Sequence, residues 1–283
     1  MRFFHRRLGP GDMPRTVGGR GPRAAAPTWW RGLRLPSGHS WLWRSVSLIG
    51  LVAVWELAAR LAGSNMLPTP VAVLAALYRY TRNGQLPLEL GITLARVVAA
   101  FVVAMTAGTV VGFMMGRSRK LDLVLDGPLV LALNIPALVI VILCYLWLGL
   151  TEVAVIAAVA LNKIPVVVVT TREGTRAVDS RLLAVAQVYH VPRGVTLYRV
   201  ILPQLYPYLM ASARNGLALI WKIVLVAELL GQSNGVGFEL SVFFQFFDIT
   251  SILAYTLAFA AVVMAMEAGV MRPLEKRLMR WRG

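Results

Sequence analysis

Residues 92–116 read ITLARVVAAFVVAMTAGTVVGFMMG, and this stretch decides the class of fold. Arg96 is its one ionisable residue. A helix needs roughly 20 apolar residues to cross the hydrocarbon core of a bilayer. The apolar residues here are continuous and do not alternate with a period of two, which favours a helix over a barrel strand. We therefore interpret residues 92–116 as a transmembrane helix.

Five further stretches have the same character, so the chain has six predicted spans. Of the 283 residues, 58% are hydrophobic and 15% are charged, and the mean hydropathy is +0.67. A water-soluble domain keeps about a quarter of its residues charged, so the composition excludes that class. We predict an all-α bundle of six transmembrane helices within residues 45–283. The predicted spans are residues 45–62, 92–116, 128–149, 152–171, 205–230 and 251–271.

The distribution of Lys and Arg predicts that both termini are cytoplasmic. With the N-terminus inside, the inner segments carry 22 Lys and Arg residues and the outer segments carry two. The inner segments are residues 1–44, 117–127, 172–204 and 272–283, and the outer ones are 63–91, 150–151 and 231–250. Because residues 1–44 combine nine Arg with many Gly and Pro, we expect a disordered cytoplasmic tail. In the first outer segment, the spacing of Val71, Leu74, Leu77 and Tyr78 predicts a short amphipathic helix at the membrane surface.

Several functions are disfavoured by the residues that the chain lacks. The net charge of +16 could indicate nucleic-acid binding, but the basic residues lie between apolar runs and not on a soluble face, so we predict no nucleic-acid partner. Three His and one Cys are too few for a His- or Cys-based metal site, and no Gly-Lys dipeptide exists for a phosphate-binding loop. The acidic residues within the spans, Glu56, Glu228 and Glu267, are far apart and interpreted as unpaired, so no catalytic residue is predicted.

The inner segment 172–204 is long for a loop without structure of its own. A helix is predicted over residues 180–191, where Leu182, Leu183, Ala186 and Tyr189 recur at helical spacing. Pro192-Arg193-Gly194 then predicts a turn, and a second helix is expected over 195–202, ending before Pro203. Such an elbow, residues 180–203, suits the docking of another protein at the cytoplasmic face.

The elbow resembles the signature region of permease subunits of binding-protein-dependent ABC importers. The family motif reads Glu-Ala-Ala, three residues, Gly, nine residues and Ile-x-Leu-Pro. This chain keeps the ending as Val200-Ile201-Leu202-Pro203, but Ala184 stands in the place of the Glu and His190 in the place of the Gly. We expect Gly194 to provide the permissive backbone position that His190 lacks.

Further segments resemble the branch of this family that imports nitrate, sulfonates, taurine and related small solutes. They are Leu67-Pro68-Thr69-Pro70, Thr93-Leu94-Ala95-Arg96-Val97-Val98, Asn134-Ile135-Pro136-Ala137-Leu138, Val226-Ala227-Glu228-Leu229-Leu230 and Gly235-Val236-Gly237-Phe238.

The resemblance implies a type I importer permease in the bacterial inner membrane, surrounded by lipid and working as a homodimer. It implies an extracytoplasmic solute-binding protein and ABC ATPase subunits as partners. ATP and Mg would be bound by the ATPase and no cofactor by this chain. The elbow residues implied to couple to the ATPase are Leu182, Leu183, Ala184, Ala186, Tyr189, His190, Gly194 and Pro203.

Polar residues at membrane depth are costly and usually face a cavity or a partner, so they are candidates for the translocation path. The candidates are Asn134, Asn162, Lys163, Trp221, Lys222 and Glu228. Alternatively, Glu228 and Arg214 reach the two membrane surfaces and Lys163 is paired inside the bundle. The excess of positive charge in the spans favours an anionic solute. A stand-alone secondary transporter or channel remains the alternative function, although no internal repeat supports it.

Overall fold

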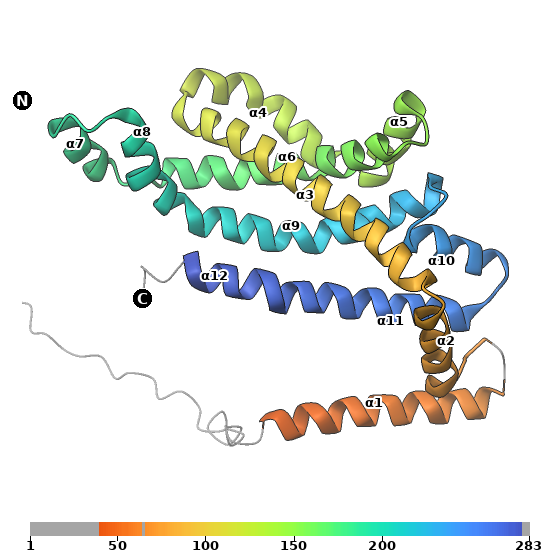
Figure 1. Cartoon of the computed structure of the whole chain (residues 1–283). Helices are drawn as coiled ribbons and strands as arrows, with labels where there is room; N and C mark the ends of the chain where they lie inside the picture. Colours follow the sequence, from red (N-terminus) through yellow and green to blue (C-terminus); the bar gives the residue numbers. More distant parts are fainter. Residues whose placement is uncertain (1–39, 64–65, 279–283) are drawn as a thin grey trace, which may run out of the picture. The chain divides into compact units, whose positions relative to one another are not determined.

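The structure is a computed structural model that describes residues 40–63 and 66–278. The chain divides into two compact units, Met1–Val52 and Ala53–Gly283. The predicted tail 1–44 lies largely outside the described residues, which begin with helix α1 (Ser40–Ala62). The described residues contain helices and no strand, which confirms the predicted all-α fold (Figure 1).

Five described helices are long and apolar enough to cross a membrane. They correspond to five of the six predicted spans. In the structure they run over Ser45–Ala62 of α1, α3 (Gln85–Arg117), α6 (Glu152–Arg176), the helix Arg193–Gly231 that ends in α9 (Leu202–Gly231), and the helix Ile249–Glu275 that begins with α11 (Ile249–Met266). The last of these continues through a π-helical turn into α12 (Arg272–Leu278).

The prediction of a continuous third span over residues 128–149 is wrong. Two helices replace it, α4 (Arg119–Asn134) and α5 (Ala137–Leu148), and they are bent by 99° relative to each other. Pro136 causes the break, because a proline lacks the N–H that would continue α4 and forces Ile135 into an extended conformation. The side chain of Asn134 donates to the Val130 carbonyl at 2.7 Å and so closes the end of α4. The pair forms one broken span or a re-entrant loop.

Helices α3 and α6 pack closely and in parallel because α3 carries glycines at every fourth position. A Cβ atom added to Gly108 would lie 2.5 Å from Val167 Cβ, and one added to Gly116 would lie 2.5 Å from Thr175 Cβ. Gly112 has an equally close neighbour in the backbone of α6. Small residues of this kind let two membrane helices approach backbone to backbone.

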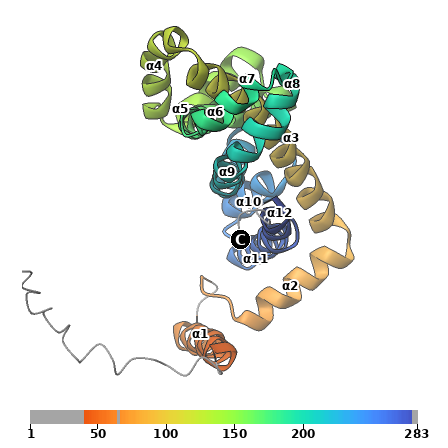
Figure 2. The ribbon, with the colours of Figure 1, turned by 90° about the vertical axis from the view of Figure 1, so that its left-hand side faces the viewer.

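Helix α9 packs antiparallel on α6. Gly174 near the end of α6 contacts Tyr208 near the start of α9, and Lys163 in the middle of α6 contacts Gly216. Figure 2 shows α9 between α6 and α11, and Trp221 of α9 packs edge-on against Phe259 of α11, with ring centroids 5.4 Å apart. The core of the bundle is therefore α3, α6 and α9.

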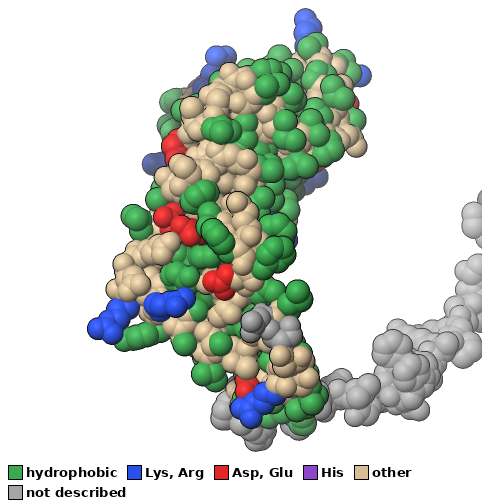
Figure 3. Space-filling view, turned by 90° about the vertical axis from the view of Figure 1, so that its right-hand side faces the viewer, with side chains coloured by type: hydrophobic (Ala, Val, Ile, Leu, Met, Phe, Trp, Pro, Cys, Tyr) green, Lys and Arg blue, Asp and Glu red, His purple; other side chains and the backbone are tan. Residues whose placement is uncertain are grey.

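The bundle has two ends, the Arg96 end and the elbow end. The Arg96 end holds the first residues of α3 and α6 and the last residues of α9, together with α10 (Val236–Gln245). The elbow end holds the last residues of α3 and α6 and the first residues of α9. Figure 3 views the Arg96 end, where Asp and Glu side chains form separate patches among hydrophobic ones.

The short helix predicted after Pro70 is confirmed as α2 (Pro70–Arg82). The Thr69 hydroxyl caps it by accepting from the Ala72 N–H at 3.3 Å. Its buried side is formed by Pro70, Val73 and Ala76, whereas Val71, Leu74 and Tyr78 are exposed.

The elbow has the predicted first helix but a different second one. Helix α7 (Ser180–Val188) is followed by α8 (Arg193–Thr196) and a π-helical turn, η2 (Leu197–Ile201), that leads directly into α9. The prediction that the second helix ends before Pro203 is wrong. In η2 the Leu202 N–H donates to the Leu197 carbonyl, five residues earlier, so the turn is wider than that of an α-helix. This wider turn comes directly before Pro203, which has no N–H to donate, and the helix continues through the proline.

The turn after α7 places His190 where the family motif has Gly. His190 has a φ of 46°, in the left-handed region. The His190 N–H donates to Gln187 O at 3.0 Å and the Val191 N–H to Ala186 O at 2.9 Å, which is the Schellman ending of a helix. The expectation that Gly194 provides this position is wrong, since Gly194 lies within α8 and has no positive φ.

Candidate functional site

A buried arginine joins the three core helices at the Arg96 end. The Arg96 side chain on α3 is 2% exposed. Its Nε lies 2.7 Å from Glu152 Oε2 on α6, and its Nη1 lies 2.7 Å from Glu228 Oε1 on α9. The sequence-based interpretation that Glu228 is unpaired is therefore wrong, because this carboxylate is fully buried in an ion pair.

The same guanidinium binds the turn that connects α9 to α10. Arg96 donates to the side chains of Gln232 and Asn234 and, at 3.0 Å, to the Asn234 carbonyl. We call Arg96, Glu152, Glu228, Gln232 and Asn234 the Arg96 cluster. It fixes two spans and one connecting turn to α3 through a single side chain.

The first N–H groups of α10 are bound by side chains of α3 and α9. Gly235 N–H donates to the Glu89 carboxylate, Val236 N–H to Thr93 Oγ1 at 2.9 Å, and Gly237 N–H to Glu228 Oε2 at 2.9 Å. Carboxylates at a helix N-terminus accept hydrogen bonds from its free N–H groups and interact favourably with the helix dipole. Glu228 therefore acts twice, as the partner of Arg96 and as part of the cap of α10.

Two glycines make this arrangement possible. Gly235 has a φ of 98°, and a Cβ atom there would lie 2.5 Å from Glu228 Cδ. A Cβ atom on Gly237 would lie 2.3 Å from the Leu225 carbonyl oxygen. Any larger residue would displace the Glu228 carboxylate or the end of α9, which gives a physical reason for the Gly235-Val236-Gly237 sequence.

The length of α3 places the cluster relative to a membrane. From Arg96 to Arg117 the helix rises about 31 Å at 1.5 Å per residue, which matches the thickness of the hydrocarbon core. The Arg96 cluster and the elbow end therefore lie near opposite faces of that core. Lys163 lies roughly 15 Å from both Glu152 and Arg172 along α6, near its middle.

Lys163 is a buried amine between α6 and α9. The residue is 1% exposed, and within the described residues its Nζ has no hydrogen-bond partner. The Lys163 side chain lies against Gly216 of α9, where an added Cβ atom would lie 2.5 Å from Lys163 Cε. The interpretation that Lys163 is paired inside the bundle is wrong for the described part of the chain.

The structure does not bring all the predicted path residues together. Glu228 belongs to the Arg96 cluster, and Lys163 lies in the α6–α9 contact. Asn134 is exposed at the α4–α5 break, Asn162 is half-buried on α6, and Lys222 is exposed on α9. Trp221 is buried, and its Nε1 is among the described buried atoms without a hydrogen-bond partner.

Ion pairs also cluster at the elbow end. Arg172 Nη1 lies 2.7 Å from Asp126 and 3.3 Å from Asp122, and Arg176 also binds Asp122, so α6 is tied to α4. Nearer the middle of the bundle, two residues from Gly216, Arg214 of α9 reaches Glu267 Oε1 at 3.1 Å and Glu275 Oε2 at 3.4 Å.

The elbow presents apolar side chains around two cavities. One cavity, of about 540 Å³, is lined by Leu182, Val185, Ala186, Val191, Val195, Arg199, Val200, Pro203 and Gln204. The other, of about 700 Å³, includes Leu183, Ala186, His190 and Arg193 in its lining. Leu182 is 48% and Tyr189 is 78% exposed, and Ala184 and His190 are exposed as well. Leu182, Ala184, Tyr189, His190 and Gly194 are therefore accessible to a partner, whereas Leu183 and Pro203 are half-buried and the predicted docking residue Ala186 is buried.

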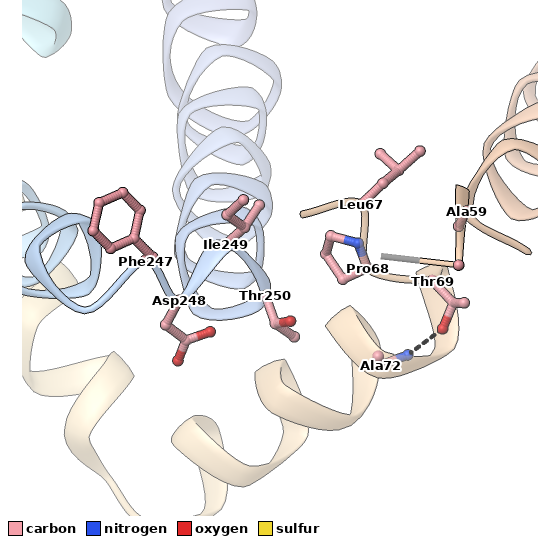
Figure 4. Close-up of a pocket in the computed structure, with 10 residues that line it drawn as sticks. Ala59, Leu67, Pro68, Thr69, Ala72, Phe247, Asp248, Ile249 and Thr250 are labelled. Atoms are coloured by element: carbon pink, nitrogen blue, oxygen red, sulfur yellow. Dashed lines mark hydrogen bonds between the residues drawn. The ribbon is translucent and has the colours of Figure 1, made fainter. Parts of the chain in front are cut away.

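A third cavity, of about 460 Å³, lies between residues 59–72 and 247–250 (Figure 4). Pro68 is directed toward the turn that begins α11, whereas the Thr69 side chain points to Ala72 and accepts a hydrogen bond from its N–H. Phe247 in this turn has a φ of 54° and is 77% exposed, next to the equally exposed Phe246.

The fold and these sites define an integral membrane protein with an exposed helical elbow at one end. Residues 104–272 match the family described as binding-protein-dependent transport system inner membrane component. The chain belongs to this family and is a multi-pass protein of the inner membrane. Permeases of this family work with a solute-binding protein and ATPase subunits.

Individual relatives extend this match over most of the chain. An aliphatic sulfonates transport permease protein, SsuC of Bacillus subtilis, is 31% identical over 254 residues, covering 90% of this chain and 88% of that protein. The taurine transport system permease protein TauC of Escherichia coli is 29% identical, covering 86% and 94%. The nitrate import permease protein NrtB of Synechocystis is 28% identical, covering 69% and 74%.

One solved structure shows the same fold. In the crystal structure of an amino acid ABC transporter with histidines, one chain aligns with a TM-score of 0.54 and 19% sequence identity. The alignment covers 71% of this chain and 97% of that one.

Sequence reasoning misses most of the Arg96 cluster. It identifies Arg96 as a charge within a span and as part of a family-like segment, but it does not identify the partners of this side chain. The available signal is the coincidence of one basic and one acidic residue at the same predicted membrane depth, Arg96 and Glu228. Glu152 gives no such signal, because an acidic residue at the first turn of a helix is common on any surface.

Proposed function

We propose that this chain is the permease subunit of an ATP-driven importer for a small anionic solute such as a sulfonate, taurine or nitrate. The observation that carries the proposal is the similarity to the sulfonate, taurine and nitrate permeases over 69% to 90% of this chain. The charges support an anion. The carboxylates Glu152, Glu228 and Glu267 all have arginine partners, whereas Lys163 and Lys222 have no ion-pair partner among the described residues.

In the proposed assembly two copies of this chain form the pore, and an ATPase subunit docks on each elbow. ATP and Mg are bound by the ATPase, and a solute-binding protein delivers the solute at the Arg96 end. The elbow end is cytoplasmic in this arrangement, as the Lys and Arg distribution predicts. The residues proposed for coupling are those predicted from the sequence that are accessible on the elbow, and of the predicted path residues Glu228 and Trp221 are buried in the structure.

The continuity of the helix that begins inside the elbow supports this coupling. Residues Arg193–Gly231 form one helix, which spans about 58 Å at 1.5 Å per residue. It begins next to the proposed ATPase site and ends at Glu228 in the Arg96 cluster. A movement of the elbow is therefore transmitted along α9 to the opposite face of the membrane, which is the kind of rigid-body switch that alternating access requires.

Reconstitution tests the proposal. The chain is assembled in proteoliposomes with the ATPase and the solute-binding protein encoded in neighbouring reading frames, and uptake of labelled taurine, an alkanesulfonate and nitrate is measured. We expect uptake of at least one of these anions that requires ATP, the ATPase and the binding protein. Uptake by the permease alone would instead identify a stand-alone secondary transporter or channel.

A further inference from the structure

One face of α9 is exposed but does not have the composition of a lipid-facing surface. Its exposed residues between the two ends of the bundle include a row at helical spacing that is mostly small or polar, flanked by the ion-paired Arg214 and by Val226: Ala211, Asn215, Ala218, Leu219 and Lys222. We call these five residues the α9 stripe. By contrast, the exposed residues of α3 at membrane depth are large and apolar, such as Val102, Val103 and Val110.

Lys222 is the charged member of this stripe. It lies six residues before Glu228, which is roughly 9 Å along α9 from the Arg96 cluster toward the elbow end. Among the described residues nothing forms a hydrogen bond or ion pair with it. The neighbouring carboxylate, Glu228, is occupied by Arg96 and by the cap of α10. A free ammonium group at this depth is costly against hydrocarbon and requires water or an anion.

We propose that the α9 stripe faces the aqueous translocation path and that the Lys222 ammonium contacts the anionic group of the solute in transit. This inference rests on the proposed function and assigns the contact that favours anions. An ammonium is a compact charge with three donors, which suits an oxyanion with several acceptor oxygens and no fixed orientation. In a homodimer the two copies of Lys222 flank one path, and a solvated contact of this kind lets the solute leave again.

Accessibility of position 222 to water tests the first half of the proposal. The variant Lys222→Cys is made with Cys144→Ala, since Cys144 is the one cysteine of the chain and is buried. The assembled transporter is treated with membrane-impermeant charged methanethiosulfonate reagents, without nucleotide and with trapped ATP. We expect labelling that differs between the two states and that slows when the transported anion is present.

Leu161 provides a matched control for this labelling. It is an exposed residue on α6 within the same membrane core, roughly 6 Å nearer the elbow end than Lys222, because Lys163 lies opposite Gly216 of the antiparallel α9. We expect Leu161→Cys to remain unlabelled in both states. If the Lys222→Cys variant is also unlabelled in both states, or if both positions react alike, the stripe does not line a path and the proposal is overturned.

Uptake by charge variants tests the second half. We expect Lys222→Met to lower anion uptake at least tenfold, Lys222→Arg to retain a large part of it, and the control Leu161→Met, outside the α9 stripe, to leave it unchanged. Stimulation of ATP hydrolysis by the loaded binding protein should persist in Lys222→Met, which shows that the assembly is intact. Wild-type uptake by Lys222→Met, or equal loss in Lys222→Arg, overturns the contact. If the proposed function itself is wrong, the unaltered chain shows no ATP-dependent uptake, which distinguishes that result from a failure of the Lys222 contact.

Discussion

The guanidinium Nη1 of Arg96 lies 2.7 Å from Oε1 of Glu228, and this contact joins two helices at positions 132 residues apart in the chain. Both side chains are buried, and the remaining donors of Arg96 bind Glu152, Gln232 and Asn234. A buried ion pair surrounded by further hydrogen bonds is strongly coupled, because loss of one partner leaves the other charge without compensation.

The variant Arg96→Met should therefore be strongly destabilised. The substitution leaves Glu228 and Glu152 unpaired, and breaking a buried pair costs about 3–5 kcal/mol. Thermal unfolding of the purified protein in detergent measures this loss. The control Arg60→Met removes an exposed pair with Glu56, which is worth roughly 0.3–0.5 kcal/mol. Equal melting temperatures for the two variants would show that the cluster contributes no stability.

Replacing the unpaired lysine in the bundle should have the opposite effect on stability. Lys163→Met removes a buried amine that lacks a described hydrogen-bond partner and keeps a side chain of similar length, so we expect a higher melting temperature. If Lys163 also belongs to the translocation path, the same variant transports more slowly. Lys222→Met, at an exposed position, serves as the control and should melt as the unaltered protein does. A lower melting temperature for Lys163→Met would indicate a partner that forms only in the assembled transporter.

The turn after α7 should become more stable when His190 is replaced by Gly. A left-handed conformation costs a residue with a side chain roughly 1–2 kcal/mol more than glycine, and His190 has a φ of 46°. Hydrogen exchange of the amides over residues 185–191 should slow in His190→Gly. The control Gly194→Ala lies within α8, where alanine is the better helix former. Faster exchange in His190→Gly would mean that the imidazole itself supports the turn.

The docking prediction concerns Tyr189, which is 78% exposed beside the apolar elbow cavities. We expect Tyr189→Ala to uncouple ATP hydrolysis from uptake, because covering a large apolar side chain contributes roughly 1.5–3 kcal/mol. Ala184→Glu should be tolerated or should strengthen ATPase binding, since it restores the carboxylate of the family motif. Unchanged uptake in Tyr189→Ala, together with loss in the double variant Arg181→Ala, Arg193→Ala, would show that charge holds the interface.

Glu239 on α10 predicts a pH dependence of stability. Burial raises the pKa of this carboxyl group, and the nearby charge of Glu89 adds to the effect. The folded protein therefore holds this proton more tightly than the unfolded chain, so the stability that Glu239 contributes is present at acidic pH and is lost as the pH rises through its folded pKa. Glu239→Gln should raise the melting temperature relative to the unaltered protein at pH 8 more than at pH 5. A difference that does not change with pH would contradict this.

Helix positions could be predicted because the length of an apolar run is a local property. The first, second, fourth, fifth and sixth predicted spans correspond to helices in the structure, and so do α2 and α7. The prolines show that the local sequence does not decide whether a helix continues through a proline. Pro136 breaks a helix, Pro165 lies inside α6 without breaking it, and Pro203 is accommodated by the π-helical turn before it. A proline leaves one backbone carbonyl group of the helix without its N–H donor. The outcome depends on whether a neighbouring helix or a local change of helix geometry supplies another donor.

The partners of Arg96 could not be predicted for a similar reason. Glu228 and Glu152 reach Arg96 only because the glycines of α3 set the register of α3 against α6, and Gly216 lets α9 approach α6. Such distances depend on packing between segments far apart in the chain, and one sequence carries no direct signal for them.

The number of residues between Arg96 and Gly108 on α3 therefore determines whether Arg96 points toward its carboxylate partners. Gly108 meets Val167 and Arg96 meets Glu152, so two contacts on one helix are matched to two on its neighbour. An insertion of one residue between them would turn Arg96 by about 100° around the helix axis and direct it away from both carboxylates, while the glycine contacts stayed in place. The same holds for the matching interval from Glu152 to Val167 on α6, so we expect these two intervals to change length less readily during evolution than the loops between the helices.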